Sequence, residues 1–96
     1  MEAMPPLADA EIAAALAALP GWSRKDDEIV KTFECASFRA AIAFVVQIGF
    51  LAEQADHHPD LDVRWRTVKV ALSTHSANGL TNRDFDLAGE IEALGA

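Results

Sequence analysis

The chain has 96 residues, of which 51% are hydrophobic and 24% are charged. This length and balance predict a single globular domain spanning residues 1–96 and argue against an intrinsically disordered chain. Fifteen acidic residues against eight basic ones give a formal net charge of −7, which disfavours direct binding to nucleic-acid phosphates and favours a neutral ligand.

The N-terminal segment and the cysteine content bear on location. Residues 1–6 lack a basic stretch followed by an apolar run, so we expect no signal peptide and a cytoplasmic protein. Cys35 is the only cysteine, so the chain can form no internal disulfide, and we expect its thiol to be buried.

The first half of the chain predicts one helix and two short strands. Residues 7–19 are rich in alanine, carry apolar residues at helical spacing and are followed by proline and glycine, which end helices. Residues 22–24 and 28–35 then read as two strands around the polar turn at residues 25–27. Lys31 breaks the apolar face of the second strand.

Residues 38–52 predict a second, strongly apolar helix for which Ser37 is a suitable N-cap. We expect two apolar sides: Phe38, Ala41, Ile42, Val45 and Ala52 on one, and Phe44, Ile48 and Leu51 on the other. The segment is shorter than the roughly 20 residues that cross a bilayer. We therefore expect no membrane contact, one side covering a sheet and the other meeting another subunit. The alternative is two packed layers within one chain.

Residues 61–74 give the clearest strand pattern. The apolar positions are odd up to Trp65 and even from Val68, a change that a two-residue turn at residues 66–67 would produce. This register pairs Trp65 with Val68, Val63 with Val70 and Leu61 with Leu72 on one face, with Arg64 and Lys69 on the other. Because Arg-Thr is not a favoured turn dipeptide, only the pattern supports this hairpin.

A third helix is predicted to begin after Thr81, because Thr81 and Asp84 have the spacing of a capping box. The predicted element order is therefore α-β-β-α-β-β-α. Because its tight connections are hairpins, we expect an α+β fold: a four-stranded antiparallel sheet with three helices packed on one face.

The three histidines of the chain lie within nineteen residues of one another, at positions 57, 58 and 75. Histidine both donates and accepts protons near neutral pH. The acidic residues flanking them are Glu53, Asp56, Asp60 and Asp84. This clustering between regular elements predicts a proton-transfer site.

The expected geometry follows from the chain around these residues. Glu53 and His57 are four apart, so they share a face if the helix extends that far. Pro59 disfavours helical geometry at His58, so the two neighbouring rings should point in different directions. His75 is expected at the end of the last strand, where helix and strand ends gather on one rim of the sheet.

Each residue also has a purely structural interpretation. His57 could be a favourable partner of the helix dipole, His58 could fill a turn, and His75 could be an exposed strand end. Asp84 could serve only as a cap, and Glu53 could lie in a solvated last turn. We favour a functional site, because the structural interpretation requires that all three histidines cluster with acidic residues by chance.

The same residues allow two other kinds of site to be considered, a metal centre and a nucleophilic cysteine. Three histidines and a carboxylate could hold zinc, but adjacent histidines are poorly placed to chelate one ion and no HxH or HExxH spacing occurs. Cys35 lies in a predicted strand far in sequence from any histidine, which argues against nucleophilic catalysis. We therefore expect no metal, and we expect Trp22 and Trp65 in the core rather than stacked on a ligand.

Several segments together form a recognisable pattern: Glu-x-x-Asp-His-His-Pro at residues 53–59, Trp65, Ser-Thr-His at residues 73–75, Gly-Leu-Thr at residues 79–81 followed by Asp84, and Gly-Trp at residues 21–22. Across residues 21–94 the chain resembles the pterin-4a-carbinolamine dehydratases. The resemblance implies a hydro-lyase that dehydrates 4a-hydroxytetrahydropterin to the quinonoid dihydropterin. It also implies a homodimer or homotetramer with no metal or organic cofactor, which recycles the cofactor of aromatic amino-acid hydroxylases.

The resemblance also implies site residues. The segments that would contact the pterin contain Asp56, His57, His58, Ser73, Thr74 and His75, with Glu53 and Asp84 at acidic positions nearby. Our hypothesis is that His57 and His75 exchange acid and base roles. His58 would bind and orient the pterin, and Glu53 would hold an imidazole in its working tautomer. Leu61 departs from the aromatic residue of many animal relatives, which affects the pocket rim.

A non-catalytic function remains as the alternative. Animal members of the family also act as dimerisation partners of a homeodomain transcription factor, through the surface of the long apolar helix. This chain could be such a protein-binding module, or an assembly factor, although the intact histidine set argues against the latter.

Overall fold

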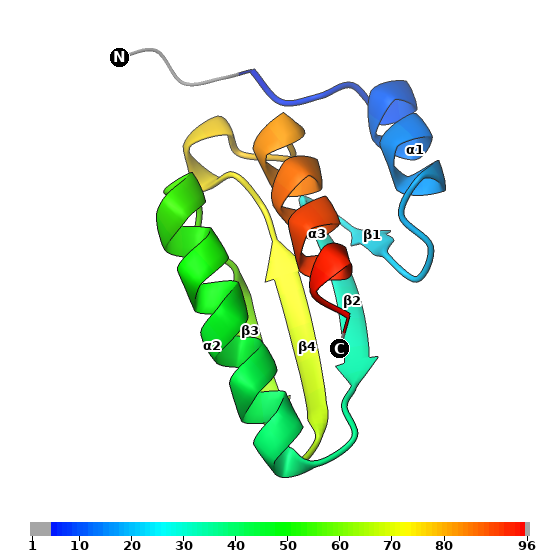
Figure 1. Ribbon diagram of the computed structural model, residues 1–96. Helices are drawn as coiled ribbons and strands as arrows, with labels where there is room; N and C mark the ends of the chain where they lie inside the picture. Colours follow the sequence, from blue (N-terminus) through cyan, green and yellow to red (C-terminus); the bar gives the residue numbers. More distant parts are fainter. Residues whose placement is uncertain (1–4, 96) are drawn as a thin grey trace.

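A computed structural model of the chain describes residues 5–95 (Figure 1). In that range the elements are α1 (Asp9–Ala17), β1 (Ser23–Lys25), β2 (Glu28–Glu34), α2 (Phe38–Ala55), β3 (Asp60–Arg64), β4 (Thr67–Leu72), the 3₁₀ turn η1 (His75–Ala77) and α3 (Asn82–Leu94). The predicted order α-β-β-α-β-β-α and the α+β class are confirmed.

The four strands form one antiparallel sheet in the order β1-β2-β4-β3. Helices α2 and α3 lie side by side over one face of this sheet (Figure 1). The core between the layers includes Ile29, Phe33, Val68, Val70 and Leu72 from the strands and Ile12, Phe44, Ile48, Leu87 and Ile91 from the helices. The buried Cys35 and Trp22 belong to it as well, as predicted.

The β3–β4 hairpin has a different register from the predicted one. Val63 pairs with Val68 and Leu61 with Val70, so the two-residue turn lies at Trp65 and Arg66. A shift of two residues preserves the alternation, which is why the predicted faces are right although the predicted pairs are wrong. Trp65 adopts φ +51° at the turn and is 69% exposed, so its expected place in the core is wrong.

Helix α2 begins after Ser37, whose Oγ accepts a hydrogen bond from the Ala40 backbone N–H at 3.0 Å, as predicted. It extends three residues beyond the predicted end. The residues that it buries are Ala41, Phe44, Ile48 and Ala52, and the large apolar residues that it exposes are Phe38, Ile42, Val46 and Phe50. The buried stripe contains residues from both predicted sides, and the exposed stripe takes Phe38 and Ile42 from the side that also holds the buried Ala41. The predicted division of α2 into two sides is therefore wrong.

The length of α2 also bears on membrane contact. With 18 residues and a mean hydropathy of 1.3, α2 reaches the length and composition of a minimal membrane span, which the shorter predicted helix did not. Its position over the sheet is that of the core helix of a globular domain, and such helices meet the same criterion.

Lys31, which interrupts the predicted apolar face of β2, has a structural role. Its ammonium lies 4.7 Å from the centre of the Phe33 ring and pairs with the carboxylate of Glu92 on α3. The indole Nε1–H of Trp22 donates to the same Glu92 at 2.8 Å. Glu92 therefore ties the end of α3 to β2 through Lys31 and to the segment just before β1 through Trp22.

Candidate functional site

His57 is turned into the protein at the end of α2. The helix ends at Asp56, which adopts a left-handed conformation with φ +50°. The turn directs the next side chain inward: the His57 side chain is 8% exposed, and its Nε2 lies 2.5 Å from Oδ1 of Asp84 on α3. The chain thus brings together two predicted site residues that are 27 positions apart.

Asp84 is fully buried and forms the centre of a hydrogen-bond network. Its Oδ2 accepts from the Thr74 hydroxyl at 2.8 Å and from the Thr81 backbone N–H at 2.9 Å. The hydroxyls of Thr74 and Thr81 are 2.8 Å apart. A buried carboxylate requires such partners because it has lost its hydration. Asp84 therefore caps α3, as its spacing predicted, and also holds the His57 ring.

His58 faces away from His57, as the following proline predicted. Its Nε2 lies 2.7 Å from Oε1 of Glu53, and both side chains are more than half exposed. The condition under which Glu53 and His57 would share a helix face is not met, because α2 ends before His57. Glu53 instead contacts the histidine five positions away.

Ser73 and His75 lie just beyond the end of β4. Thr74 forms an isolated bridge with Gly79, and His75 begins η1, so this histidine follows the strand rather than ending it. The half-buried Ser73 and the exposed His75 line a hollow of about 290 Å³ together with the β1–β2 turn. The residues contributed by that turn are Lys25, Asp26, Asp27 and Glu28.

Arg83 was not among the predicted site residues. Its Nη2 donates to the backbone carbonyl oxygens of Asp56 at 2.5 Å and Ala55 at 3.4 Å, so it holds the end of α2 just before His57. No local sequence pattern could reveal this role, because the acceptors are backbone atoms 27 and 28 positions away. The Asp56 side chain is exposed, and only its backbone takes part.

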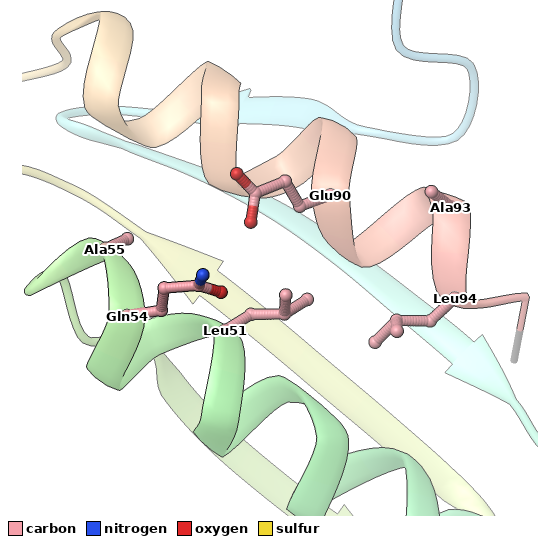
Figure 2. Close-up of a pocket in the computed structure, with 6 residues that line it drawn as sticks. All are labelled: Leu51, Gln54, Ala55, Glu90, Ala93 and Leu94. Atoms are coloured by element: carbon pink, nitrogen blue, oxygen red, sulfur yellow. The ribbon is translucent and has the colours of Figure 1, made fainter.

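A hollow larger than the one beside His75 lies elsewhere, in the groove between α2 and α3 (Figure 2). It measures about 600 Å³ and is lined by Leu51, Gln54, Ala55, Glu90, Ala93 and Leu94. It contains none of the predicted site residues, so cavity size alone does not locate the chemistry. Within residues 5–95, no group of three or more histidine, cysteine or acidic side chains is placed to hold a metal ion.

A family model described as pterin 4 alpha carbinolamine dehydratase matches residues 5–94. The chain belongs to this family. The resemblance read from the histidine segments is thereby confirmed, and with it the expected class, because the pterin carbinolamine dehydratases are hydro-lyases.

Individual members of the family cover nearly the whole chain. A Roseiflexus castenholzii protein named as a pterin-4-alpha-carbinolamine dehydratase is 58% identical over 88 residues, which are 92% of this chain and 95% of the relative. The crystal structure of a transcriptional coactivator/pterin dehydratase from Brucella melitensis superposes with a TM-score of 0.91 at 35% identity. It covers 95% of this chain and 99% of that one.

A more distant structure shares the fold alone. It is a pterin dehydratase-like protein identified as a RuBisCO assembly factor in the alpha-carboxysome, with a TM-score of 0.65 and 20% identity. The match covers 78% of this chain and 87% of that one.

Proposed function

We propose that this chain removes water from a 4a-hydroxytetrahydropterin and releases the quinonoid dihydropterin. The observation that carries the proposal is the buried His57–Asp84 pair, formed within the segments that resemble the dehydratase pattern in a member of that family. His58 adjoins this pair in sequence. His75 adjoins it through Thr74, which bonds to the same carboxylate.

The reaction requires two proton movements. The C4a–O bond breaks as the hydroxyl receives a proton and leaves as water. The N5–H proton is lost, and its electron pair forms the N5=C4a double bond. Positioned acids and bases accelerate such steps by about 10²–10⁴-fold. Imidazole side chains suit both roles at neutral pH.

In our proposal His57 and His75 supply these groups and exchange acid and base roles with the configuration at C4a. Asp84 binds one ring nitrogen of His57 and leaves the other, Nδ1, for proton transfer. His58 binds and orients the pterin, and Glu53, whose Oε1 contacts His58 Nε2, sets the tautomer of this imidazole.

The remaining predicted residues divide into contacts and supports. Ser73 and Asp56 retain solvent-accessible surface and are proposed to contact substrate. The sequence places Asp84 among the residues expected to contact the pterin. Because Asp84 has no exposed surface, we propose that it acts through His57 and does not touch the pterin. The Thr74 hydroxyl is committed to Asp84 and Thr81. Its backbone N–H and carbonyl oxygen are bonded to Gly79 and Ala77, so we propose that Thr74 supports the site and does not contact the pterin.

The wider setting stays a prediction. We expect the dihydropterin, once a separate reductase has reduced it to the tetrahydropterin, to serve again as the cofactor of an aromatic amino-acid hydroxylase in the cytoplasm, with no metal or organic cofactor needed by the dehydratase itself.

The decisive experiment is stopped-flow dehydration of freshly generated 4a-hydroxytetrahydropterin, with and without the protein. We expect acceleration above the spontaneous rate that survives EDTA treatment and is lost in a His57→Gln/His75→Ala variant. The glutamine retains a polar group facing Asp84, and circular dichroism checks that the variant is folded. His58→Ala should raise KM more than it lowers kcat.

Two results would contradict this proposal. Full activity in the double variant would remove the histidines from catalysis, and loss of activity on EDTA treatment would point to a metal-dependent reaction.

The alternative is a protein-binding module. It is favoured by the exposed apolar residues Phe38, Ile42, Val46 and Phe50 on α2. The names of the coactivator and assembly-factor relatives point in the same direction. Absence of any acceleration from a folded protein would support this alternative.

A further inference from the structure

The chain between β4 and α3 closes on itself in a loop that carries His75. The Thr74 N–H donates to the carbonyl oxygen of Gly79 at 2.9 Å, and the Gly79 N–H donates to that of Thr74 at 3.4 Å. Asn78 adopts a left-handed conformation with φ +54°, which helps to reverse the chain between them. His75 is exposed and lies between the two bonded positions. The position of its imidazole therefore depends on how the whole loop is held against the domain.

The segment before α1 holds this loop from the N-terminal side. Residues 5–8 run past the start of α3 on their way to α1 (Figure 1). The Leu7 N–H donates to the carbonyl oxygen of the buried Leu80 at 2.8 Å, and the Leu7 side chain packs against the core. The ring of Pro6 lies so close to Gly79 that a Cβ added to this glycine would be 3.0 Å from the Cβ of Pro6. Only glycine therefore fits at position 79 without moving the proline.

The same segment is fixed at its other end by α1. The Ala8 N–H donates to Oε1 of Glu11 at 2.9 Å where the helix begins, and Ile12 in the next turn is buried in the core. The pyrrolidine ring of Pro6 restricts the backbone, so holding this residue in place costs less conformational entropy than holding another residue would. Residues 5–8 thus form a stiff connection from a packed helix to the loop that carries His75.

We propose, on the basis of the proposed function, that residues 5–8 act as a strap that positions His75 for proton transfer, with Pro6 and Gly79 as the deciding contact. Gly79 bonds to Thr74, and Thr74 directly precedes His75, so a displaced strap moves the backbone of the histidine. A small displacement of a group that transfers protons lowers the rate steeply. Pro6 and Gly79 are therefore positioning residues, which act through His75 and do not touch the pterin.

The test is a pair of substitutions at the deciding contact. Gly79→Ala places a methyl group against Pro6, and we expect kcat to fall by about tenfold with less than about a twofold change in KM. The NMR resonance of the His75 imidazole Cε1–H should shift, while that of His58, in the segment after α2, should not. Pro6→Gly alone should lower kcat by about threefold. Because it also removes the opposing Cβ, the Pro6→Gly/Gly79→Ala variant should be no slower than Pro6→Gly.

The matched control is Gly89→Ala on α3, where an added Cβ meets no atom within 4 Å. It should leave kcat and the His75 resonance unchanged.

Two results would overturn the proposal. Rate losses that multiply in the double variant would place the effect of Gly79→Ala within the loop itself. An unchanged kcat and His75 resonance in Pro6→Gly would also overturn it, and this variant stays folded because Pro6 is exposed. A wild type that does not accelerate dehydration would count against the proposed function instead. In that case the His75 resonance in the same variants still decides whether the strap positions the ring.

Discussion

Asp84 shows how one side chain can serve both the fold and the proposed site. Its two carboxylate oxygens meet three donors, on His57, Thr74 and the Thr81 backbone. These donors come from three separate segments, so the carboxylate joins the end of α2 to the segment after β4 and to the start of α3. The orientation of the His57 ring consequently depends on the packing of all three.

Replacement of Asp84 by asparagine should therefore be costly although the two side chains have the same shape. The amide nitrogen would have to face either His57 or the donors on the other side, which leaves a buried group without a partner. We expect a loss of about 3 kcal/mol in unfolding free energy, measured by urea denaturation. The exposed Asp86→Asn on the same helix should change it by less than about 0.5 kcal/mol. Equal losses in the two variants would contradict this reading of the network.

Arg83 is the second residue whose role depends on a distant partner. Arg83→Ala removes the hydrogen bonds to the last carbonyls of α2 and a positive charge from the negative end of that helix. We expect kcat to fall by about tenfold with a smaller change in KM, because the segment carrying His57 and His58 is no longer held in position.

Addition of guanidinium ion should partly restore the rate of the Arg83→Ala variant, which loss of stability alone would not allow. Lys69→Ala, which removes an exposed cation from the open face of the sheet, is the control and should behave like the wild type. A variant of Arg83 with unchanged kcat would exclude this positioning role.

Among the elements, α2 positions the site because both of its ends are defined by specific contacts. Ser37 begins the helix and the left-handed Asp56 ends it. The length between them sets where His57 leaves the helix and therefore which histidine each acidic residue can reach. One additional helical residue would rotate the whole His57–His58 segment.

Ser37→Ala removes the N-cap of α2, and we expect a loss of about 1 kcal/mol in unfolding free energy. The reason is that the Ala40 backbone N–H loses its acceptor. Ser76→Ala makes the same change at an exposed residue of η1 and serves as the control. Chemical denaturation of both variants measures the difference, and indistinguishable midpoints would contradict the assigned cap.

On the scale of the whole molecule, the outer side of α2 remains uncovered in the single chain. Phe38, Ile42, Val46 and Phe50 are between 41% and 71% exposed along one helix. Contiguous apolar surface of this kind marks association sites in globular proteins. The homodimer or homotetramer expected from the sequence therefore remains our prediction, with this stripe as its interface.

The variant Val46→Asp/Phe50→Asp should lower the mass measured by sedimentation equilibrium to that of one chain, 10.3 kDa, because buried charges oppose association. Trp65→Ser removes an equally exposed aromatic residue away from the stripe and should leave the mass unchanged. A wild-type protein that sediments as a monomer at all concentrations would contradict the prediction.

The sequence by itself determined the features that depend on near neighbours. These are the element order, the cap at Ser37, the inward and outward faces of β3 and β4, and the grouping of the histidines with acidic residues. Helix caps and strand alternation are set by residues a few positions apart, so their patterns are visible in the printed chain.

The tertiary structure alone decided which of those residues meet. It determined the hairpin register, the buried side of α2, the pairing of Glu53 with His58, and the contacts of His57 and Arg83 with partners at least 27 positions away. Such contacts depend on how α2, α3 and the sheet pack, and many arrangements satisfy the same local pattern. Burial selects one of them, because only one packing covers the apolar faces while giving the buried Asp84 carboxylate its partners.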